Sequence, residues 1–270
     1  MDKHIFWLAS YPKSGNTWVR SMISSLLYSN DGNFNFELML KVSQFPEKKY
    51  FKNFVNDFSN FNEIKESWIL AQDTINLDNQ IKVLKTHQGN YTVGKNSFTN
   101  DQNTLATIYI VRDPRALITS ISNHYTLSID GACDFLITPQ IIGNTKKWED
   151  KETGMQCLLG KWSDHYRSWT RNKNNLLLIK YEDLIQNPKN EFKKIINFLK
   201  KYLDIKTDDN KNKKILETTS FENLKKMEQK GLFKENVLNK KDDSKVNFFH
   251  LGPANNWKDN LNENVKNKIE

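Results

Sequence analysis

Lys13, Ser14, Gly15 and Thr17 stand together in the segment "YPKSGNTW", residues 11–18. The apolar run "IFWLAS" precedes it and apolar residues at helical spacing follow, so it is predicted to be a turn from a buried strand into a helix. The first turn of a helix leaves backbone N–H groups unpaired, and the helix dipole adds about half a positive charge there. Gly15 would let the backbone approach a ligand closely. The residue types and their spacing therefore predict a phosphate-binding turn.

The order of residues in this turn differs from the phosphate loop of nucleoside-triphosphate hydrolases and kinases. That loop reads G-x-x-x-x-G-K-[ST], with the lysine after the last glycine and a hydroxyl on magnesium. In this sequence Lys13 precedes Gly15, no glycine stands upstream at that spacing, and no clear acidic partner for a metal follows a second strand. A nucleotide kinase-like phosphotransferase is nevertheless one hypothesis for the function. Dependence of the activity on magnesium would distinguish such an enzyme from one that needs no metal.

Two other groups of residues could take part in chemistry. His87 ends the apolar stretch "IKVLKTH", residues 81–87, and an imidazole can accept a proton from a hydroxyl at neutral pH. The sequence by itself does not distinguish this histidine from the other four. Lys85 stands two residues earlier and would point to the same side of a strand. Arg112 and Ser120 are eight residues apart, at the end of an apolar run and on the predicted helix after it. From their positions alone they can be a surface charge and a helix serine, although a guanidinium group is also able to bind two oxygens of a phosphate.

The elements that must position these residues alternate between strands and helices. Residues 81–87, 104–112 and 175–181 are short and apolar, and we predict that they are interior strands of a parallel sheet. Asp113 followed by Pro114 is a typical helix start, and residues 187–203 form an amphipathic pattern. The fold class is therefore α/β, a single domain over residues 1–270 with a central parallel sheet flanked by helices. Ligands of such sheets bind beyond the carboxyl ends of the strands.

Composition and charge narrow the classes of function. The chain has 270 residues, of which 37% are hydrophobic, and a formal net charge of +8. This charge suits polyanionic ligands such as nucleotides, nucleic acid or acidic membranes. A nucleic-acid-binding module would carry clustered aromatic and basic motifs, and the sequence contains none. We therefore expect no nucleic-acid partner.

The cysteines and the hydropathy of the sequence indicate in which cellular compartment the protein is expected. Cys133 and Cys157 give neither a disulfide framework nor a metal-ligand pattern, and we expect both to be buried apolar residues in a reducing environment. The sequence begins directly with the first predicted strand, and no apolar run approaches the ~20 residues of a membrane span. These features predict a soluble, cytoplasmic protein, and its oligomeric state is left open.

Five motifs in order resemble those of sulfotransferases that use 3′-phosphoadenosine 5′-phosphosulfate (PAPS). They are "YPKSGNTW", "LKTH" at 84–87, "VRDPRALITS" at 111–120, "YEDL" with "NPK" at 181–189, and "TTSFENLKK" at 218–226. Together they span most of the chain and include the P-loop-like turn that binds the phosphosulfate in that family. The resemblance covers the nucleotide-binding part of the fold well and the acceptor-binding part poorly.

The resemblance implies a role for each matching residue. His87 would be the general base, and Lys13 and Lys85 would neutralise charge on the transferring sulfuryl group. The residues implied at the nucleotide are Lys13, Ser14, Gly15, Asn16 and Thr17 at the 5′-phosphate, Arg112 and Ser120 at the 3′-phosphate, Trp18, Tyr181, Thr219 and Phe221 at the adenine, and Gly252 in the tail turn. The family usually has threonine where Asn16 stands, a change that keeps a hydrogen-bonding side chain.

The tail departs from the family pattern. Members often carry Arg-Lys-Gly before a Trp-Lys pair, whereas the segment "HLGPANNWK" keeps Gly252, Trp257 and Lys258 but has His250 and Leu251 in place of the two cations. The dimerisation pattern that some members show is also missing here. The second anchor for the 3′-phosphate is therefore expected to be weaker.

The resemblance implies that a sulfuryl group passes from PAPS to a hydroxyl or amine of a small-molecule or glycan acceptor, with adenosine 3′,5′-bisphosphate (PAP) as product. We expect no metal, because lysines and a helix N-terminus can offset the charge of the SO3 group. Aromatic residues such as Phe34, Phe36, Phe45 and Trp68 either line an acceptor cleft or pack a core.

Overall fold

The computed structural model describes residues 4–143, 155–235, 237–238 and 245–270. The chain forms two compact units, each assembled from three stretches of sequence. The first unit comprises Met1–Tyr11, Val42–Ile110 and Thr138–Leu178, and the second comprises Pro12–Lys41, Val111–Ile137 and Ile179–Glu270.

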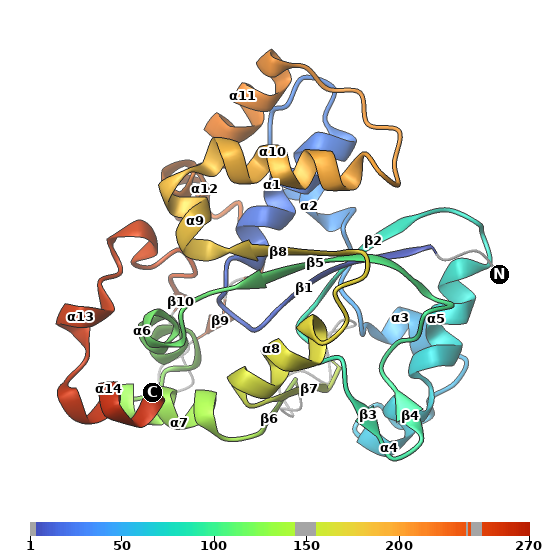
Figure 1. Cartoon of the computed structure of the whole chain (residues 1–270), viewed down its shortest axis with the longest axis horizontal. Helices are drawn as coiled ribbons and strands as arrows, with labels where there is room; N and C mark the ends of the chain where they lie inside the picture. The colour runs from blue at the N-terminus through green and yellow to red at the C-terminus, as the bar shows by residue number, and fades with distance from the viewer. Residues whose placement is uncertain (1–3, 144–154, 236, 239–244) are drawn as a thin grey trace. The chain divides into compact units, whose positions relative to one another are not determined.

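A four-stranded sheet has the order β2-β1-β5-β8 (Figure 1). Its strands are β1 (Ile5–Ser10), β2 (Lys82–Thr86), β5 (Thr104–Val111) and β8 (Leu176–Lys180). β1 pairs in parallel with β2 on one side and with β5 on the other. This arrangement confirms the predicted α/β class with a central parallel sheet.

All six residues of β1 are buried, because the strand has a neighbour on each side and is covered on both faces. Trp7 is the centre of an aromatic core in the first unit. Its ring centroid lies 5.5 Å from that of Phe45, 5.3 Å from that of Phe98 and 6.3 Å from that of Trp169. Through the Trp7 side chain, these contacts pack one face of β1 against the aromatic core.

The prediction that residues 81–87 and 175–181 are interior strands was wrong, since β2 and β8 lie at the two edges of the sheet. The apolar character of β2 has another cause. The Lys85 N–H donates to the Ser43 carbonyl and the Phe45 N–H donates to the Lys85 carbonyl, so the segment before α3 covers part of this edge. Such cover protects an edge strand and allows it to be apolar.

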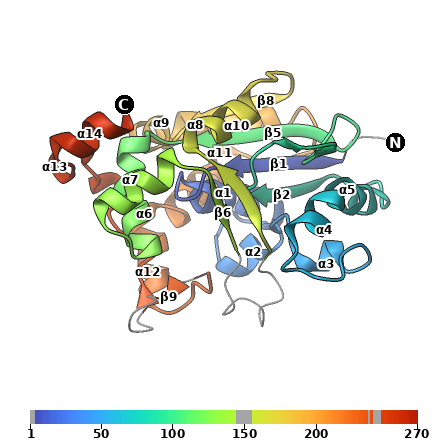
Figure 2. The ribbon, with the colours of Figure 1, turned by 90° about the horizontal axis from the view of Figure 1, so that it is seen from below.

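The other elements of the first unit are short. Its helices are α3 (Lys48–Phe51), α4 (Phe61–Glu66), α5 (Trp68–Asn76) and α8 (Trp162–Thr170), and its antiparallel pairs are β3 (Thr92–Val93) with β4 (Asn96–Ser97) and β6 (Gln140–Ile142) with β7 (Cys157–Gly160). Figure 2 shows β6 and β7 side by side. Residues 144–154, between these two strands in the sequence, lie outside the described residues.

The second unit is mainly helical. Its elements are α1 (Asn16–Tyr28), α2 (Phe36–Leu40), α6 (Pro114–Tyr125), α7 (Ile129–Ile137), α9 (Tyr181–Gln186), α10 (Pro188–Leu199), α11 (Asp209–Thr218), α12 (Phe221–Gln229), β9 (Val237–Leu238), β10 (Lys245–Val246), the 3-10 helix η2 (Gly252–Ala254), α13 (Trp257–Asn260) and α14 (Glu263–Ile269). The amphipathic pattern of α10 is confirmed, because Phe192, Ile195, Ile196 and Leu199 are all buried. α13 and α14 pack against α6 and α7 (Figures 1 and 2).

Both cysteines are buried, as predicted from the sequence. Burial raises the pKa of the Cys157 thiol to about 12, so the thiolate that reacts with oxidants or metals is strongly disfavoured. Within the described ranges, no helix has the length and apolar character needed to cross a membrane.

Substitution of Asp113 tests the start of α6. The Asp113 side chain accepts a hydrogen bond from the Arg115 N–H at 2.9 Å and also pairs with the Arg115 guanidinium. We expect Asp113→Ala to lower the free energy of unfolding by about 1 kcal/mol, because it removes the N-cap. Asp113→Asn keeps the cap and should cost less, because a partly exposed ion pair contributes little. Urea denaturation measures both, and equal losses would show that the ion pair, not the cap, stabilises the helix.

Candidate functional site

The turn after β1 has two residues in the left-handed region of backbone conformation. Lys13 has a φ of 66° and Gly15 has a φ of 101°. Gly15 is the N-cap of α1 and has no side chain to accept from the first turn of the helix. The N–H groups of that turn are therefore not capped by a side chain of Gly15, an arrangement that suits an anion.

Gly15 is required by its neighbour as well as by its backbone. A Cβ at this position would lie 2.6 Å from Tyr181 Cδ2, so only glycine lets the tyrosine ring approach the turn. The same ring makes an edge contact with Trp18, with centroids 6.1 Å apart, and has the Arg112 guanidinium carbon 4.3 Å from its centroid. Tyr181 thus joins three of the residues predicted for nucleotide binding.

Arg112 follows β5 directly and is only 4% exposed. Its Nη1 donates to the Ser120 hydroxyl at 3.3 Å and to the Lys13 carbonyl at 3.1 Å. Burial lowers the pKa of the guanidinium, while the fields of Tyr181, Glu182 and Asp113 raise it. Arginine remains protonated at such a position, so a buried positive charge lies beside the turn.

Three buried polar atoms in this cluster have no hydrogen-bond partner within the described residues: Ser14 Oγ, Trp18 Nε1 and Arg112 Nε. An unpartnered buried polar group costs about 1–3 kcal/mol, so native structures rarely tolerate several together. A ligand that presents hydrogen-bonding oxygens would remove this cost. The cluster therefore has the chemistry of a site for an anionic, polar ligand.

The Lys13 ammonium is held by the tail of the chain. Its Nζ lies 3.4 Å from the centroid of the Phe248 ring and 3.4 Å from the Phe248 carbonyl oxygen. The Phe248 and Phe249 N–H groups donate to the carboxylate of Glu228 at 2.6 and 3.0 Å. The sequence analysis assigned no role to Phe248 or Glu228, because nothing in the local pattern links them to a turn more than 200 residues earlier.

The remaining nucleotide candidates of the second unit lie at the start of α12 and in η2. A Cβ on Gly252, whose φ is 54°, would lie 2.3 Å from the Phe221 ring, so these two residues are in close contact. The Phe221 ring also packs on Phe249, with centroids 6.1 Å apart. Thr219 is fully buried, and its hydroxyl donates to the Ile215 carbonyl at 2.7 Å. The Thr219 hydroxyl is thus already hydrogen-bonded to the C-terminal end of α11.

Lys85 and His87 belong to the first unit, Lys85 within β2 and His87 just beyond it. The His87 Nδ1 lies 2.8 Å from the Ser10 carbonyl oxygen and 3.4 Å from the Ser10 hydroxyl. A carbonyl only accepts, so Nδ1 carries the proton in the neutral ring and Nε2 carries the lone pair. The ring is therefore held in the tautomer that can take a proton at Nε2.

Comparison with known proteins decides the family. The model of the family described as "Sulfotransferase domain" matches residues 3–270. The chain belongs to the sulfotransferase family. It is a PAPS-dependent enzyme, and this assignment does not favour the kinase-like alternative.

Individual relatives are distant. Mouse sulfotransferase 1B1 is 28% identical over 250 residues, which cover 92% of this chain and 69% of the mouse protein. Among solved structures, retinol dehydratase in a complex with retinol and PAP has a TM-score of 0.62 at 19% identity, covering 100% of this chain and 80% of that one. Mouse sulfotransferase SULT7A1 complexed with PAP has a TM-score of 0.55 at 20% identity, covering 99% and 82%. At these identities the structures show a shared fold.

The aromatic residues that could have lined an acceptor cleft pack cores in this sulfotransferase. Phe45 and Trp68 are fully buried in the first unit. Phe34 and Phe36 belong to a buried cluster of the second unit that also contains Phe233. Of the two readings that the sequence left open for them, the structure supports core packing.

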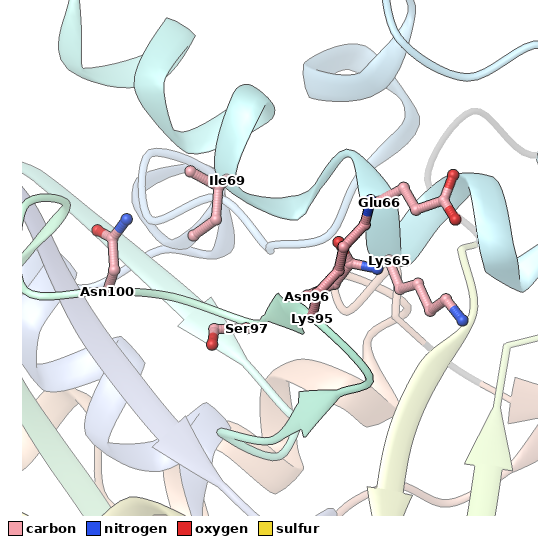
Figure 3. Close-up of a pocket in the computed structure, with 7 residues that line it drawn as sticks. All are labelled: Lys65, Glu66, Ile69, Lys95, Asn96, Ser97 and Asn100. Carbon is pink, nitrogen blue, oxygen red and sulfur yellow. The ribbon is translucent and has the colours of Figure 1, made fainter.

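The first unit of the sulfotransferase has a hollow of about 240 Å³. Figure 3 shows the residues that line it. The hollow is lined by Lys65 and Glu66 of α4, Ile69 of α5, and Asn96 and Ser97 of β4, among others. None of the residues predicted for catalysis or nucleotide binding lines it. Its charged and polar rim is that of an ordinary surface depression.

Substitution of Gly15 tests the contact between the turn and Tyr181. We expect Gly15→Ala to lower the stability by about 1–3 kcal/mol from backbone strain, and further because the new Cβ collides with the tyrosine ring. Gly231→Ala is the matched control, since Gly231 has a φ of 75° and nothing within 4 Å of its Cβ position. Chemical denaturation compares the two. Equal losses would mean that the ring moves aside without cost.

Proposed function

We propose that this sulfotransferase moves the sulfuryl group of PAPS to a hydroxyl group of a small-molecule acceptor by in-line displacement, with His87 as the general base. The observation that carries the proposal is the hydrogen bond from His87 Nδ1 to the Ser10 carbonyl. It places the proton of the neutral ring on Nδ1, so Nε2 is the basic nitrogen. Family membership supports the reaction class, and the geometry around His87 supports the choice of base.

In the proposed reaction the acceptor oxygen attacks sulfur while the bond from sulfur to the 5′-phosphate oxygen breaks. The acceptor proton passes to His87 Nε2, and adenosine 3′,5′-bisphosphate leaves with the electron pair of the broken bond. Negative charge grows on the leaving oxygen, so a cation beside it lowers the barrier. Lys13 and Lys85 are the residues proposed for this stabilisation.

The proposed nucleotide site lies in the second unit. Backbone N–H groups and side chains of Ser14, Gly15, Asn16 and Thr17 would bind the 5′-phosphate at the start of α1. Arg112 and Ser120 would bind the 3′-phosphate, and this is supported by their mutual hydrogen bond and by the unpartnered Arg112 Nε. The residues proposed beside the adenine are Trp18, Tyr181, Thr219 and Phe221, and Gly252 is proposed to contact the nucleotide from the tail turn.

The acceptor is proposed to be a small molecule with a hydroxyl group. A solved relative, retinol dehydratase, was crystallised with retinol and, in a second structure, with androsterone. A panel of a phenol, a primary alcohol, a sterol and an amine, each supplied with radiolabelled PAPS, tests the class. The proposal would be contradicted if the enzyme sulfated the amine but none of the hydroxyl compounds.

Nucleotide selectivity tests the role of Arg112. The protein should bind adenosine 3′,5′-bisphosphate roughly ten- to hundredfold more tightly than ADP, because a hydrogen bond to a charged group is worth about 1.5–3 kcal/mol. Arg112→Ala should remove most of this difference. Isothermal titration calorimetry measures all four affinities.

Arg115→Ala is the control for that experiment, since Arg115 is a neighbouring arginine paired with Asp113 at the start of α6. It should leave both affinities close to the original values. If Arg112→Ala weakens ADP as much as the bisphosphate, Arg112 supports the turn through the Lys13 carbonyl and does not bind the 3′-phosphate.

Substitution of His87 tests the base. We expect His87→Ala to lower kcat by about 10²–10⁴-fold, the usual contribution of a general base, with the affinity for the bisphosphate close to unchanged. His87→Asn is the sharper variant, because its amide can still donate to the Ser10 carbonyl but cannot take a proton. Steady-state kinetics with the best acceptor of the panel decides. An Asn variant that keeps most of its activity would assign the base to another group.

A further inference from the structure

The turn that carries His87 is held by one face of α8. Three side chains of this helix, at positions i, i+3 and i+4, bind three successive parts of the turn. The His165 Nε2 lies 3.0 Å from the His87 carbonyl oxygen, and the Trp169 Nε1 donates to the Gln88 carbonyl at 3.0 Å. The Asn90 N–H donates to the Ser168 hydroxyl at 3.0 Å. This spacing is that of a single helix face, so the three hydrogen bonds come from the same side of α8.

The direction of each hydrogen bond through His165 follows from the acceptors. The His87 carbonyl can only accept, so His165 carries its proton on Nε2. Its Nδ1 must then accept, and the Tyr109 hydroxyl, 2.8 Å away, donates to it. Burial raises the pKa of Tyr109, which keeps that hydroxyl protonated. The chain of donors runs from Tyr109 to His165, from His165 to His87, and from His87 to Ser10.

His165 is fully buried and has Tyr11 in edge contact at 5.4 Å between centroids. Burial lowers the pKa of the His165 imidazole to about 4, although its bond to the His87 carbonyl raises it. The ring is therefore neutral at physiological pH and cannot exchange a proton with the acceptor. It serves as a fixed donor.

We infer that His165 is a positioning residue for the reaction: by donating to the His87 carbonyl it fixes the backbone from which the His87 ring reaches Ser10, and so fixes the tautomer and direction of the base. The inference rests on the proposed role of His87. Without the hydrogen bond from His165, the peptide group of His87 at the end of the edge strand could rotate. The His87 ring would then move away from Ser10. A displacement of about 1 Å at a reacting group can cost on the order of 10²-fold in rate.

Three variants separate positioning from packing. His165→Leu removes the donor at similar volume, and His165→Gln keeps an N–H that can reach the His87 carbonyl. Tyr109→Phe removes only the hydroxyl that selects the tautomer of His165, and it is the mildest change to the core. The control is Gln72→Leu, because Gln72 is also fully buried in the first unit and bonds the Trp68 and Phe98 carbonyls, away from His87.

The first readout needs no acceptor. Nitrogen NMR of the protein labelled with ¹⁵N in its imidazole rings gives the tautomer of each histidine, and His87→Asn assigns the His87 signals. We expect the His87 ring of the wild type and of His165→Gln to carry the proton on Nδ1. In His165→Leu the signals should shift toward a mixture of tautomers, with a smaller shift in Tyr109→Phe. The Gln72→Leu protein should give the wild-type signals.

The second readout is turnover of PAPS with the best acceptor of the panel, together with calorimetric titration of adenosine 3′,5′-bisphosphate. We expect His165→Leu to lower kcat on the order of tenfold to hundredfold, with the bisphosphate affinity unchanged and with activity largely restored in His165→Gln. If His165→Leu does not fold, the NMR signals and kcat of Tyr109→Phe decide alone.

The outcomes distinguish the two proposals. If His87→Asn is inactive but the His165 and Tyr109 variants keep the wild-type tautomer and kcat, the positioning role is overturned and the base assignment stands. If His87→Asn stays active, the base assignment itself fails. A loss of kcat in Gln72→Leu equal to that in His165→Leu would assign the effect to general destabilisation and would also overturn the inference.

Discussion

The arrangement of several elements of the second unit depends on the buried positive charge of Arg112. The Arg112 guanidinium bonds the Lys13 carbonyl and the Ser120 hydroxyl and lies over the Tyr181 ring, so one side chain ties the turn before α1 to α6 and α9. A buried cation is costly without an anion. The carboxylates of Glu182 and Asp113 act on this charge through their fields. Among the described residues, however, the groups that its Nη1 contacts are neutral, and its Nε has no partner. The same constraint explains Gly15, since a side chain there would push away the ring on which the guanidinium rests. This arrangement suits an anionic ligand, and a phosphate is the group that a guanidinium and a helix N-terminus both favour.

The first unit positions its chemistry by a different means, because the partners of His87 are main-chain groups. The Ser10 carbonyl, at the end of the fully buried strand β1, receives the Nδ1 proton, and the backbone of β2 is held by the pairing of the two strands. Carbonyl groups of a packed strand have little freedom, so the ring is aimed by the sheet itself. The α8 side chains then restrain the turn beyond the strand end, where strand pairing no longer does so. Together these contacts fix the direction of the proposed base before any acceptor binds, which lowers the cost of orienting it in the reaction.

The parts of the structure that local signals specify could be predicted from the sequence. The turn before α1, the Asp113 cap of α6 and the buried face of α10 each follow from residues within a few positions of one another. The order of the strands could not be predicted in the same way, since β2 and β8 are as apolar as interior strands yet lie at the edges. Contacts between distant segments carry no local signal, as with Phe248 against Lys13. His165 illustrates the same limit, because only its position beneath the turn of His87 distinguishes it from the other histidines.

The tail shows how a departure from the family pattern fits the site. Where relatives carry two cations, this chain has His250 and Leu251, and burial together with the nearby Lys225 and Lys13 lowers the pKa of His250. The histidine is therefore neutral at physiological pH and adds no charge. The positive charge of this region comes instead from the two lysines, Lys225 with its Nζ 3.5 Å from the His250 carbonyl and Lys13 against the Phe248 ring. Glu228 binds the Phe248 and Phe249 N–H groups, so the backbone of this turn keeps its place without the missing side chains. The position of the tail is thus set by Glu228 and Lys13, which belong to other segments of the second unit.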